Sequence, residues 1–288
     1  DRQWSRGLGD VYKRQLPIMG KVQSFENAWD VYAMSTYNTI TSLAESKADE
    51  NILYAGTDDG IIQLTKDGGK SWEKMTVDQL PKVPSTAFVN DIKADLYDSQ
   101  TAYVALDNHK FGDYQPYLYK TIDGGKKWTS ISDGIPDGTL VRRIVQDHIN
   151  PNLLFLGTEY GVYVSLNKGE KWHKFSSGLP TIPVRDLAIQ KRENDLVLAT
   201  FGRSFYVLDD YSPLREINEE SIGKEAILFA PKKALQYNRI NGGTRSSGGA
   251  TFNAKNPPYG AIFTYYLKEG HTSKRAKRQK AEISEKVD

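Results

Sequence analysis

The sequence predicts an all-β fold made of repeated four-stranded antiparallel sheets, and three observations support this prediction. A turn motif occurs three times in the 288 residues: TKDGGKSW at 65–72, TIDGGKKW at 121–128 and SLNKGEKW at 165–172. Apolar runs of five or six residues alternate with short polar turns. The turn positions 67, 123 and 167 are 56 and 44 residues apart. A repeat of about 40–50 residues is typical of a β-propeller blade, a sheet that buries its faces only against neighbouring sheets.

Each repeat is predicted to hold four strands, which we label A to D from the inside of the propeller outwards. Strand A is predicted at 40–44, 89–93, 141–145 and 184–188, and strand B at 52–57, 101–106, 153–158 and 196–200. The B runs are apolar on both faces, as expected for a strand between two neighbouring blades. Strand C is predicted at 60–64, 116–120, 161–164 and 204–208, and strand D starts at the tryptophan of each motif. The fourth repeat lacks a complete motif, so we expect four blades, or most of them, from a larger ring.

The repeated motif fits the Ser/Thr-x-Asp-x-Gly-x-x-Trp pattern called the Asp-box, and we assign its residues structural roles. The side chains of Asp67, Asp123 and Asn167 are expected to accept hydrogen bonds from the backbone N–H groups that follow them. The glycines are expected to supply the positive φ of a short hairpin; they are Gly69, Gly125 and Gly169. The tryptophans are expected to fold back over the turns and pack there; they are Trp72, Trp128 and Trp172.

Composition excludes several classes of site. The chain has no cysteine, which rules out disulfides and thiolate metal sites. No apolar run approaches the roughly 20 residues of a membrane-spanning helix. The four histidines show no metal-ligand spacing and no phosphate-binding glycine loop is present, so we expect neither metal nor cofactor. The formal net charge is only +2, and residues 1–15 alone carry four cations against two acids, so a nucleic-acid-binding face is not supported.

Three regions are expected along the chain. Residues 1–15 resemble translated sequencing-adapter sequence and are excluded from the fold. Residues 16–217 are assigned to propeller blades, with 22–38 as the connector from an upstream blade. Residues 218–288 are assigned to a linker, the start of a C-terminal β domain with strands near 224–231 and 261–267, and a basic tail at 274–280 read as a solvated helix or loop. We expect the chain to be an internal piece of a longer protein, with an open edge at its first blade.

The motifs resemble those of the large bacterial BNR-repeat proteins, often called glycosyl hydrolases or sortilin-like proteins. Besides the three Asp-boxes, the run GRSFYVLDDYSPLR at 202–215 is similar to the final propeller blade of that family. The run NPPYGA at 256–261 is similar to the opening of its C-terminal region, so the resemblance covers about residues 21–267. It implies an exported protein, secreted or in the cell envelope, related in fold to sortilin ectodomains and xyloglucanase propellers. It implies little about activity, because fold does not determine function.

In a propeller, ligands usually bind at the rim formed by the B–C connections, whereas the Asp-box hairpins lie at the opposite rim. Four B–C connections are expected here, at 57–60, 107–115, 158–161 and 200–203. The candidate ligand-binding residues on them are Asp58, Asp59, Asp107, His109, Phe111, Tyr114, Glu159, Tyr160 and Arg203. Acids, a cation and exposed aromatic rings together suit a glycan, peptide or protein ligand.

Two functions from different classes remain open. The first is a non-catalytic propeller that binds a peptide, protein or glycan at this rim, and the sequence favours it. The second is a glycoside hydrolase that acts on a polysaccharide. Hydrolysis of a glycoside usually needs two carboxyl groups about 5–5.5 or 6.5–9.5 Å apart, and only Asp59 and Glu159 are weak candidates for such a pair. A sialidase additionally needs three convergent arginines, and the sequence places only Arg203 on this rim.

Overall fold

A computed structural model describes residues 17–18, 21–22, 39–236, 258–270 and 272–284. The chain divides into two compact units, residues 1–208 and 209–288, which we describe separately. The segment expected to be adapter-like, most of the expected connector and the glycine-rich run at 241–249 lie outside the described residues.

Antiparallel sheets make up the first unit, and we number them as blades in chain order. Blade 1 contains β3 (Ile40–Glu45), β4 (Leu53–Thr57), β5 (Ile61–Thr65) and β6 (Glu73–Thr76), followed by the 3-10 turn η2 (Val77–Gln79). Blade 2 contains β7 (Phe88–Ala94), β8 (Ala102–Asn108), β9 (Asp113–Thr121) and β10 (Thr129–Ser130), with the 3-10 turn η3 (His109–Phe111) between β8 and β9. Blade 3 contains β11 (Val141–Gln146), β12 (Leu154–Thr158), β13 (Gly161–Ser165) and β14 (His173–Phe175). Blade 4 has three described strands, β15 (Val184–Gln190), β16 (Asp195–Thr200) and β17 (Phe205–Leu208).

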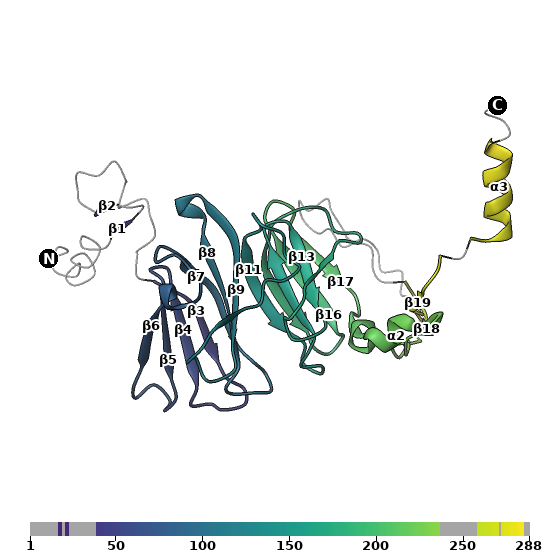
Figure 1. Cartoon of the computed structure of the whole chain (residues 1–288). Helices are drawn as coiled ribbons and strands as arrows, with labels where there is room; N and C mark the ends of the chain where they lie inside the picture. Colours follow the sequence, from purple (N-terminus) through teal and green to yellow (C-terminus); the bar gives the residue numbers. More distant parts are fainter. Residues whose placement is uncertain (1–16, 19–20, 23–38, 237–257, 271, 285–288) are drawn as a thin grey trace, which may run out of the picture. The chain divides into compact units, whose positions relative to one another are not determined.

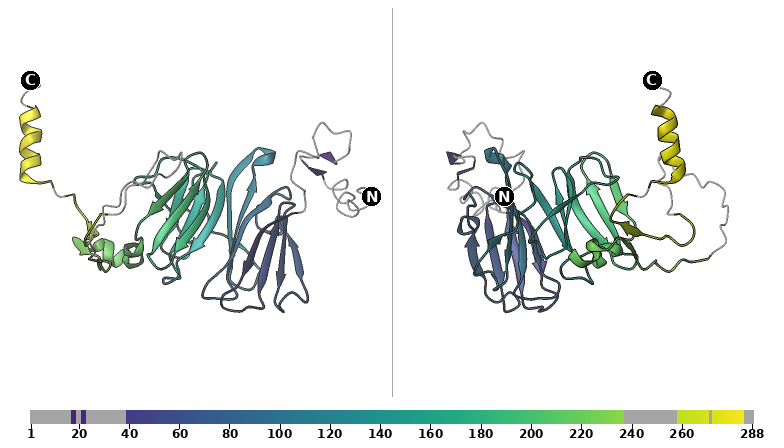
Figure 2. Two further views of the ribbon diagram at one scale, coloured as in Figure 1. Left: turned by 180° about the vertical axis from the view of Figure 1, so that it is seen from behind. Right: turned by 45° about the vertical axis from the view of Figure 1, so that its right-hand side comes forward.

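Within each blade the strands pair in chain order, and successive blades stand side by side (Figures 1 and 2). The prediction of an all-β propeller architecture with four-stranded antiparallel sheets is confirmed. All fifteen strands of the four blades overlap segments predicted from sequence. The largest difference is in blade 2, where β8 and β9 extend beyond the predicted strands. The expected loop at 107–115 is therefore reduced to residues 109–112.

The three repeated turns share one hydrogen-bond pattern. In each, the carboxylate or amide Oδ1 accepts from the backbone N–H four residues later, at 2.9 Å for Asp67, 2.9 Å for Asp123 and 3.0 Å for Asn167. The hydroxyl that opens each motif donates to that same Oδ1 atom and accepts from the glycine N–H at 2.9 to 3.0 Å. The three glycines have φ of 91°, 83° and 87°. In these turns the Asp and Asn side chains therefore accept backbone hydrogen bonds, and the glycines have positive φ.

These hydrogen bonds also set the charge state of two of the turns. The side-chain hydroxyl and backbone N–H of Ser71 hold the pKa of Asp67 below its ordinary value, and the backbone N–H of Lys127 does the same for Asp123. A carboxyl group with a lowered pKa in the folded state stabilises the fold at neutral pH. That contribution is lost as the pH falls through the ordinary pKa of aspartate and below it.

Two of the three motif tryptophans contact the preceding blade, whereas the sequence predicted contacts only with their own turns. Trp72 does pack over its own turn, donating from Nε1 to the Gly69 carbonyl at 3.2 Å, but 42% of it is exposed. Trp128 is 4% exposed and belongs to the apolar core between blades 1 and 2. Trp172 is 1% exposed and donates from Nε1 to the Ile131 carbonyl of blade 2 at 2.7 Å. The tryptophans of blades 2 and 3 therefore pack each of these blades against the one before it.

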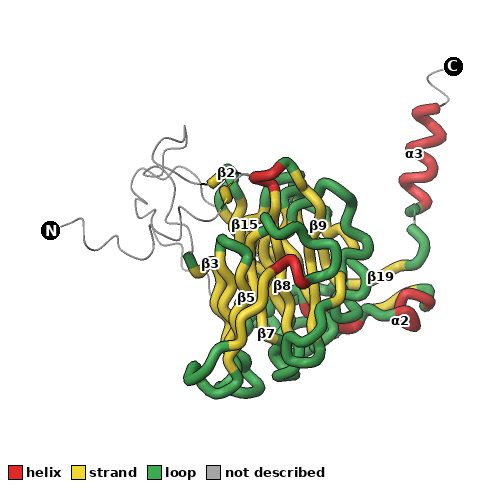
Figure 3. Tube along the Cα trace, turned by 60° about the vertical axis from the view of Figure 1, so that its left-hand side comes forward, coloured by secondary structure: helices red, strands yellow, loops and turns green. Residues whose placement is uncertain are grey.

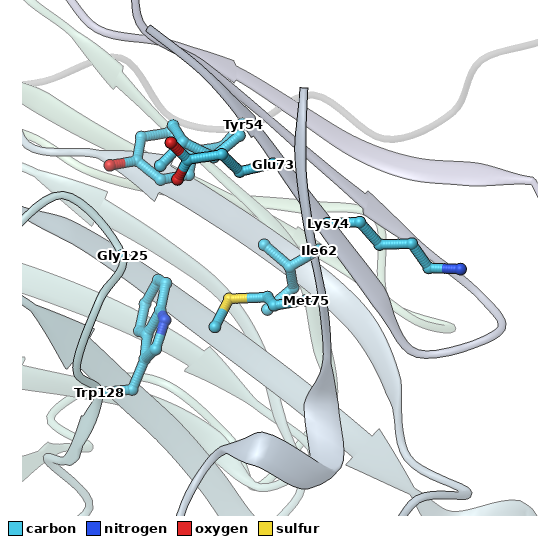
Figure 4. Close-up of a pocket in the computed structure, with 8 residues that line it drawn as sticks. Tyr54, Ile62, Glu73, Lys74, Met75, Gly125 and Trp128 are labelled. Atoms are coloured by element: carbon cyan, nitrogen blue, oxygen red, sulfur yellow. The ribbon is translucent and has the colours of Figure 1, made fainter. Parts of the chain in front are cut away.

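The core of this unit lies between blades rather than within them. One cluster joins Tyr54, Ile62 and Leu64 of blade 1 to Val89 and Ile92 of blade 2. At its outer edge a cleft of about 100 Å³ remains, in which Trp128 of blade 2 and Met75 of blade 1 face each other (Figure 4).

A second cluster joins Tyr103, Ala105 and Leu118 of blade 2 to Ile144 and Trp172 of blade 3. Burial in the clusters raises the pKa of the Tyr54 hydroxyl to about 12 and also raises that of Tyr103.

Gly134, which follows the last strand of blade 2, lies close to the backbone of Trp172, and we expect Gly134→Ala to destabilise the fold. Its φ is +87°, and an added Cβ would lie 2.2 Å from the Trp172 carbonyl oxygen. Gly138 has a similar φ of +78° with nothing within 4 Å of its Cβ position, so Gly138→Ala is the matched control. We expect about 1–2 kcal/mol for Gly138→Ala from backbone strain alone, and about 1–3 kcal/mol more for Gly134→Ala from overpacking. Urea unfolding measures both, and equal losses would contradict the close approach.

The second unit contains short elements. They are the 3-10 helix η4 (Ser212–Glu216), α2 (Glu219–Gly223), the antiparallel pair β18 (Ala226–Leu228) and β19 (Tyr265–Leu267), and α3 (Lys274–Ser284). Asn218 and Ser221 form a capping box at the start of α2. The strands expected near 224–231 and 261–267 are present in shortened form, and the basic run at 274–280 lies on the helix α3. Among the described residues, no helix combines the length and apolar character needed to cross a bilayer.

Candidate ligand-binding rim

Two opposite ends of the blades are defined by the connections between strands. At one end, the repeated C–D turns bond to the A–B turns of their own blades: Gly68 N–H to the Asn51 carbonyl, Gly124 N–H to Gln100, and Lys168 N–H to Asn152. At the other end, the B–C turns lie beside the starts of the inner strands, since Ile40 pairs with Thr57 and Val184 with Thr200. Figure 3 shows the strands running between these two sets of loops. We call the end with the B–C turns the rim.

Every inner strand carries a β-bulge at the rim. The register shifts between Ile40 and Ser42 in blade 1, and at the equivalent points in the other blades. One residue per blade is therefore left out of the regular pairing, and these residues are Thr41, Asn90, Arg142 and Arg185. A bulge redirects a side chain without ending the strand, and bulges are frequent beside functional sites.

The first two bulge residues bind the next blade. Thr41 donates from its hydroxyl to the Val89 carbonyl at 2.6 Å, and Asn90 donates from Nδ2 to the Val141 carbonyl at 2.8 Å. In both cases the acceptor is the first residue of the bulge in the following blade. These bonds fix the spacing of the inner strands at the rim.

Arg142, the third bulge residue, connects two carboxylates from different blades. Its Nη1 lies 2.6 Å from Asp107 Oδ2 of blade 2, and its Nε and Nη2 lie 3.1 and 2.8 Å from Glu159 Oε2 of blade 3. Asp107 is fully buried in β8 and also accepts from His109, whose Nδ1 lies 2.6 Å from Oδ1. Asp107 therefore contributes to the rim by positioning Arg142 and His109.

Cations and aromatic rings lie around this network. The His109 ring packs edge-on against Phe88 with centroids 5.8 Å apart, and Lys110 Nζ lies 4.7 Å from the centre of the same Phe88 ring. Arg185, the fourth bulge residue, lies 4.0 Å from Glu159 Oε1 and stacks over the exposed Phe201 ring at 5.3 Å.

Exposed aromatic side chains complete the rim. Phe111 in η3, Tyr114 in β9 and Tyr160 in the blade 3 turn are all exposed, as is Arg203 in the blade 4 turn. Tyr160 lines a cleft of about 120 Å³ together with Phe175 at the end of β14, and with Leu179 and Pro180 from the connection that leaves blade 3. Rings beside a shallow cleft can stack on a sugar or hold an apolar peptide side chain.

In blade 2, Asp113 is held by its own turn. It accepts hydrogen bonds from Tyr117 Oη at 2.6 Å and Asn108 Nδ2 at 3.1 Å. Burial opposes ionisation of Asp113, but these bonds outweigh it and lower the pKa of the carboxyl group. Burial and this same carboxylate raise the pKa of Tyr117. The pair stiffens the base of the turn that carries His109 and Phe111.

The predicted acidic residues of blade 1 also accept hydrogen bonds from nearby residues. Asp58 accepts from the Thr39 N–H at 2.8 Å, and Asp59 accepts from the Thr57 hydroxyl. Among the described residues, no hydrogen bond or ion pair joins Asp59 to Glu159, and none of their acidic or histidine side chains gather in threes as metal ligands do. The two weak catalytic candidates therefore have different partners: Asp59 interacts within blade 1, and Glu159 interacts with arginines of blades 3 and 4.

Three residues of this rim were not predicted from the sequence: Arg142, Arg185 and Asn90. The expectation that Arg203 is the only arginine at this end was wrong, because Arg142 and Arg185 contact Glu159 there. The sequence did contain a sign of these residues: the second residue of each predicted inner strand is polar in all four repeats. Strand alternation alone did not indicate that a bulge turns this position toward the rim.

A scan against protein-family models and a search of curated proteins find no match. Among solved structures, the chain is similar to a GH74 enzyme from Niastella koreensis, with 14% identity, TM-score 0.46, and coverage of 59% of this chain and 28% of that one. YCF48 bound to D1 peptide has 17% identity, TM-score 0.46 and coverage of 61% and 52%. The β-propeller domain of Cps50 (Swd1) from Myceliophteria thermophila has 15% identity, TM-score 0.46 and coverage of 60% and 53%. The chain thus spans about a quarter to a half of each of these proteins.

Proposed function

We propose that this chain is part of an exported BNR-repeat, sortilin-like protein, and that its propeller blades bind a peptide, protein or glycan at the B–C rim without hydrolysing it. The repeated turns are assigned to Asp-boxes, with a purely structural role. The observation that carries the proposal is the position of Arg142, which pairs with both Asp107 and Glu159.

This arrangement favours binding because it orders the rim in advance. A guanidinium group held by carboxylates of two blades has little conformational freedom left to lose when a ligand arrives. The groups beside it are the half-buried His109 and Lys110, the exposed Arg185 and the exposed rings of Phe111 and Tyr160. They combine stacking surfaces with positive charge, which suits acidic or hydroxyl-rich ligands.

The same arrangement disfavours the glycoside hydrolase. The two carboxyl groups of such an enzyme must both face the substrate, whereas Glu159 accepts two hydrogen bonds from the Arg142 guanidinium group, which lies between it and Asp107. Asp59, the other candidate, interacts with Thr57 in blade 1.

A screen of glycan and peptide arrays tests this function. We expect Tyr160→Ala and Arg142→Met each to weaken binding of the selected ligand at least tenfold, which corresponds to about 1.4 kcal/mol. Ile122→Ala is the control, because Ile122 is an exposed apolar side chain at the opposite end of blade 2. Equal binding by all three variants would place the ligand elsewhere. Release of reducing ends from a polysaccharide that is lost in both Asp59→Asn and Glu159→Gln would establish the hydrolase instead.

A further inference from the structure

Two buried hydrogen-bond donors of the first unit have no partner among the residues that the structure describes. They are the Tyr54 hydroxyl of blade 1 and the Nε1 atom of Trp128 in blade 2. Both side chains are almost completely buried, with 0% and 4% of their surface exposed. A buried donor without an acceptor has lost its hydrogen bonds to water and gained none in return, so such groups are rare in folded proteins. Each of these two donors therefore calls for an acceptor from outside the chain.

Comparison of the blades shows where the acceptor for Trp128 is missing. In blade 3 the equivalent Trp172 donates from Nε1 to the Ile131 carbonyl of the preceding blade at 2.7 Å. By the pairing of the outer strands, Met75 of blade 1 is the equivalent of Ile131. The Met75 carbonyl, however, accepts no hydrogen bond from Trp128. The outer strand of blade 1 thus leaves a cleft where blades 2 and 3 are joined directly.

Tyr54 and Trp128 line this same cleft, which has a volume of about 100 Å³. Its walls are apolar and include Ile62, Leu64 and Met75. In Figure 4 the ring nitrogen of Trp128 lies on the side that faces Met75. A methionine side chain is unbranched and adapts its shape easily, so the half-buried Met75 can make way for a small group that enters the cleft.

The two unpartnered groups are donors at neutral pH. Burial, together with the carboxylates of Asp98 and Asp123, raises the pKa of the Tyr54 hydroxyl to about 12, so the hydroxyl keeps its proton. The indole N–H of Trp128 can only donate. A carbonyl oxygen has two lone pairs and can accept from both. The cleft therefore suits a group that presents a carbonyl oxygen and apolar atoms.

The size of the cleft limits this group. An apolar cavity of about 150 Å³ holds one benzene molecule. By the same measure a cleft of about 100 Å³ has room for about four carbon-sized atoms, which is the size of an acetamido group. The rest of a larger ligand would have to remain outside.

The mouth of the cleft offers an acceptor for the N–H of an acetamido group. Glu73 lines the cleft, and its side chain is 71% exposed. Its Oε2 atom lies 3.0 Å from Lys66 Nζ, which leaves Oε1 to accept a hydrogen bond. The neighbouring Lys74 side chain points away from Trp128 (Figure 4).

We propose that this cleft binds the acetamido group of an N-acetylated amino sugar. The carbonyl oxygen accepts from Trp128 and Tyr54. The methyl group packs against Met75, and the N–H donates to Glu73. The sugar ring stays outside, where its hydroxyl groups meet water and the ion pair of Glu73 with Lys66. An acetylated lysine carries the same group, but its apolar stem would lie against these charges.

This site is separate from the rim. The part of blade 2 that lines it, Gly125 and Trp128, belongs to the repeated turn at the opposite end of the blade. Its occupancy therefore does not depend on the function proposed for the rim.

Titration of the isotope-labelled full chain with N-acetylglucosamine tests the proposal by nuclear magnetic resonance. We expect the indole N–H signal of Trp128, identified by its loss in Trp128→Phe, to move downfield and to saturate at millimolar sugar. Glucose lacks the acetamido group, and we expect no shift from it. The signal of Trp72 is the internal control, because Trp72 has the same place in its motif but already donates to the Gly69 carbonyl.

Variants separate binding from folding. Tyr54→Phe removes only the unpartnered hydroxyl, so we expect unchanged stability in urea and about fivefold weaker binding of N-acetylglucosamine, the effect of one hydrogen bond. Glu73→Ala should weaken binding by a similar factor. Lys74→Ala is its matched control and should leave the affinity unchanged.

The remaining outcomes would contradict the proposal. If neither sugar moves the Trp128 signal, water alone occupies the cleft. Equal shifts from glucose would rule out recognition of the acetamido group, and a larger shift from a peptide with an acetylated lysine would rule out the sugar as its carrier. A loss of stability in Tyr54→Phe would show that the hydroxyl already has a partner in the free protein.

Discussion

Trp172→Ala is expected to lower the free energy of unfolding by about 3–5 kcal/mol, the range for removing a buried aromatic side chain. The ring is 1% exposed and lies in the core between blades 2 and 3. Its Nε1 also donates to the Ile131 carbonyl at 2.7 Å, so truncation leaves that acceptor without its partner. Urea unfolding followed by circular dichroism measures the loss.

Trp72→Ala is the matched control, since Trp72 has the same place in the motif but is 42% exposed. In dilute protein confirmed as monomeric by light scattering, we expect it to lose about 1 kcal/mol or less. Similar losses from both variants would show that the tryptophan stabilises only its own turn, and would contradict its role in sealing one blade against another.

Asp91→Ala is expected to have a comparable effect through polar contacts. Asp91 is fully buried in β7 and contacts all three of the first blades: it accepts from Ser42 at 3.1 Å, from Arg143 Nη1 at 2.9 Å and from the Ile144 N–H at 3.1 Å. Its removal leaves the partners of a buried carboxylate without an acceptor. Breaking such a buried pair costs about 3–5 kcal/mol.

Asp186→Ala provides the comparison, because Asp186 is the equivalent residue of blade 4 and its side chain is 66% exposed. In monomeric protein we expect a loss of about 0.5 kcal/mol or less, as for other surface positions. A loss below about 1 kcal/mol for Asp91→Ala would mean that water replaces the carboxylate and that the three blades are held by apolar packing alone.

The strands were predictable because their signal is local. Alternating turns and apolar runs place the strands of all four blades, and the chemistry of Asp67 and Gly69 gives the turn geometry directly. The partner of each tryptophan was not predictable in the same way. Trp72 and Trp172 have the same motif around them, and their environments differ because, among the four described blades, blade 3 has a blade before it and blade 1 is the first.

The site was less predictable than the fold for a related reason. Sequence reasoning located the B–C turns and so found His109, Glu159 and Tyr160. It missed Arg142 because a bulge depends on the pairing of two strands, and the sequence of one strand does not reveal it. Asp107 was expected on a loop, whereas β8 extends through it and buries it.

The bulge at the same place in all four inner strands has a consequence for how such a protein can change. Because positions 41, 90, 142 and 185 are excluded from the regular ladder, the residue at any one of them can be exchanged while the strand around it keeps its register. Thr, Asn and Arg already occupy this position within one chain. A single substitution can therefore change the side chain that one blade presents at the rim, without remodelling the loops.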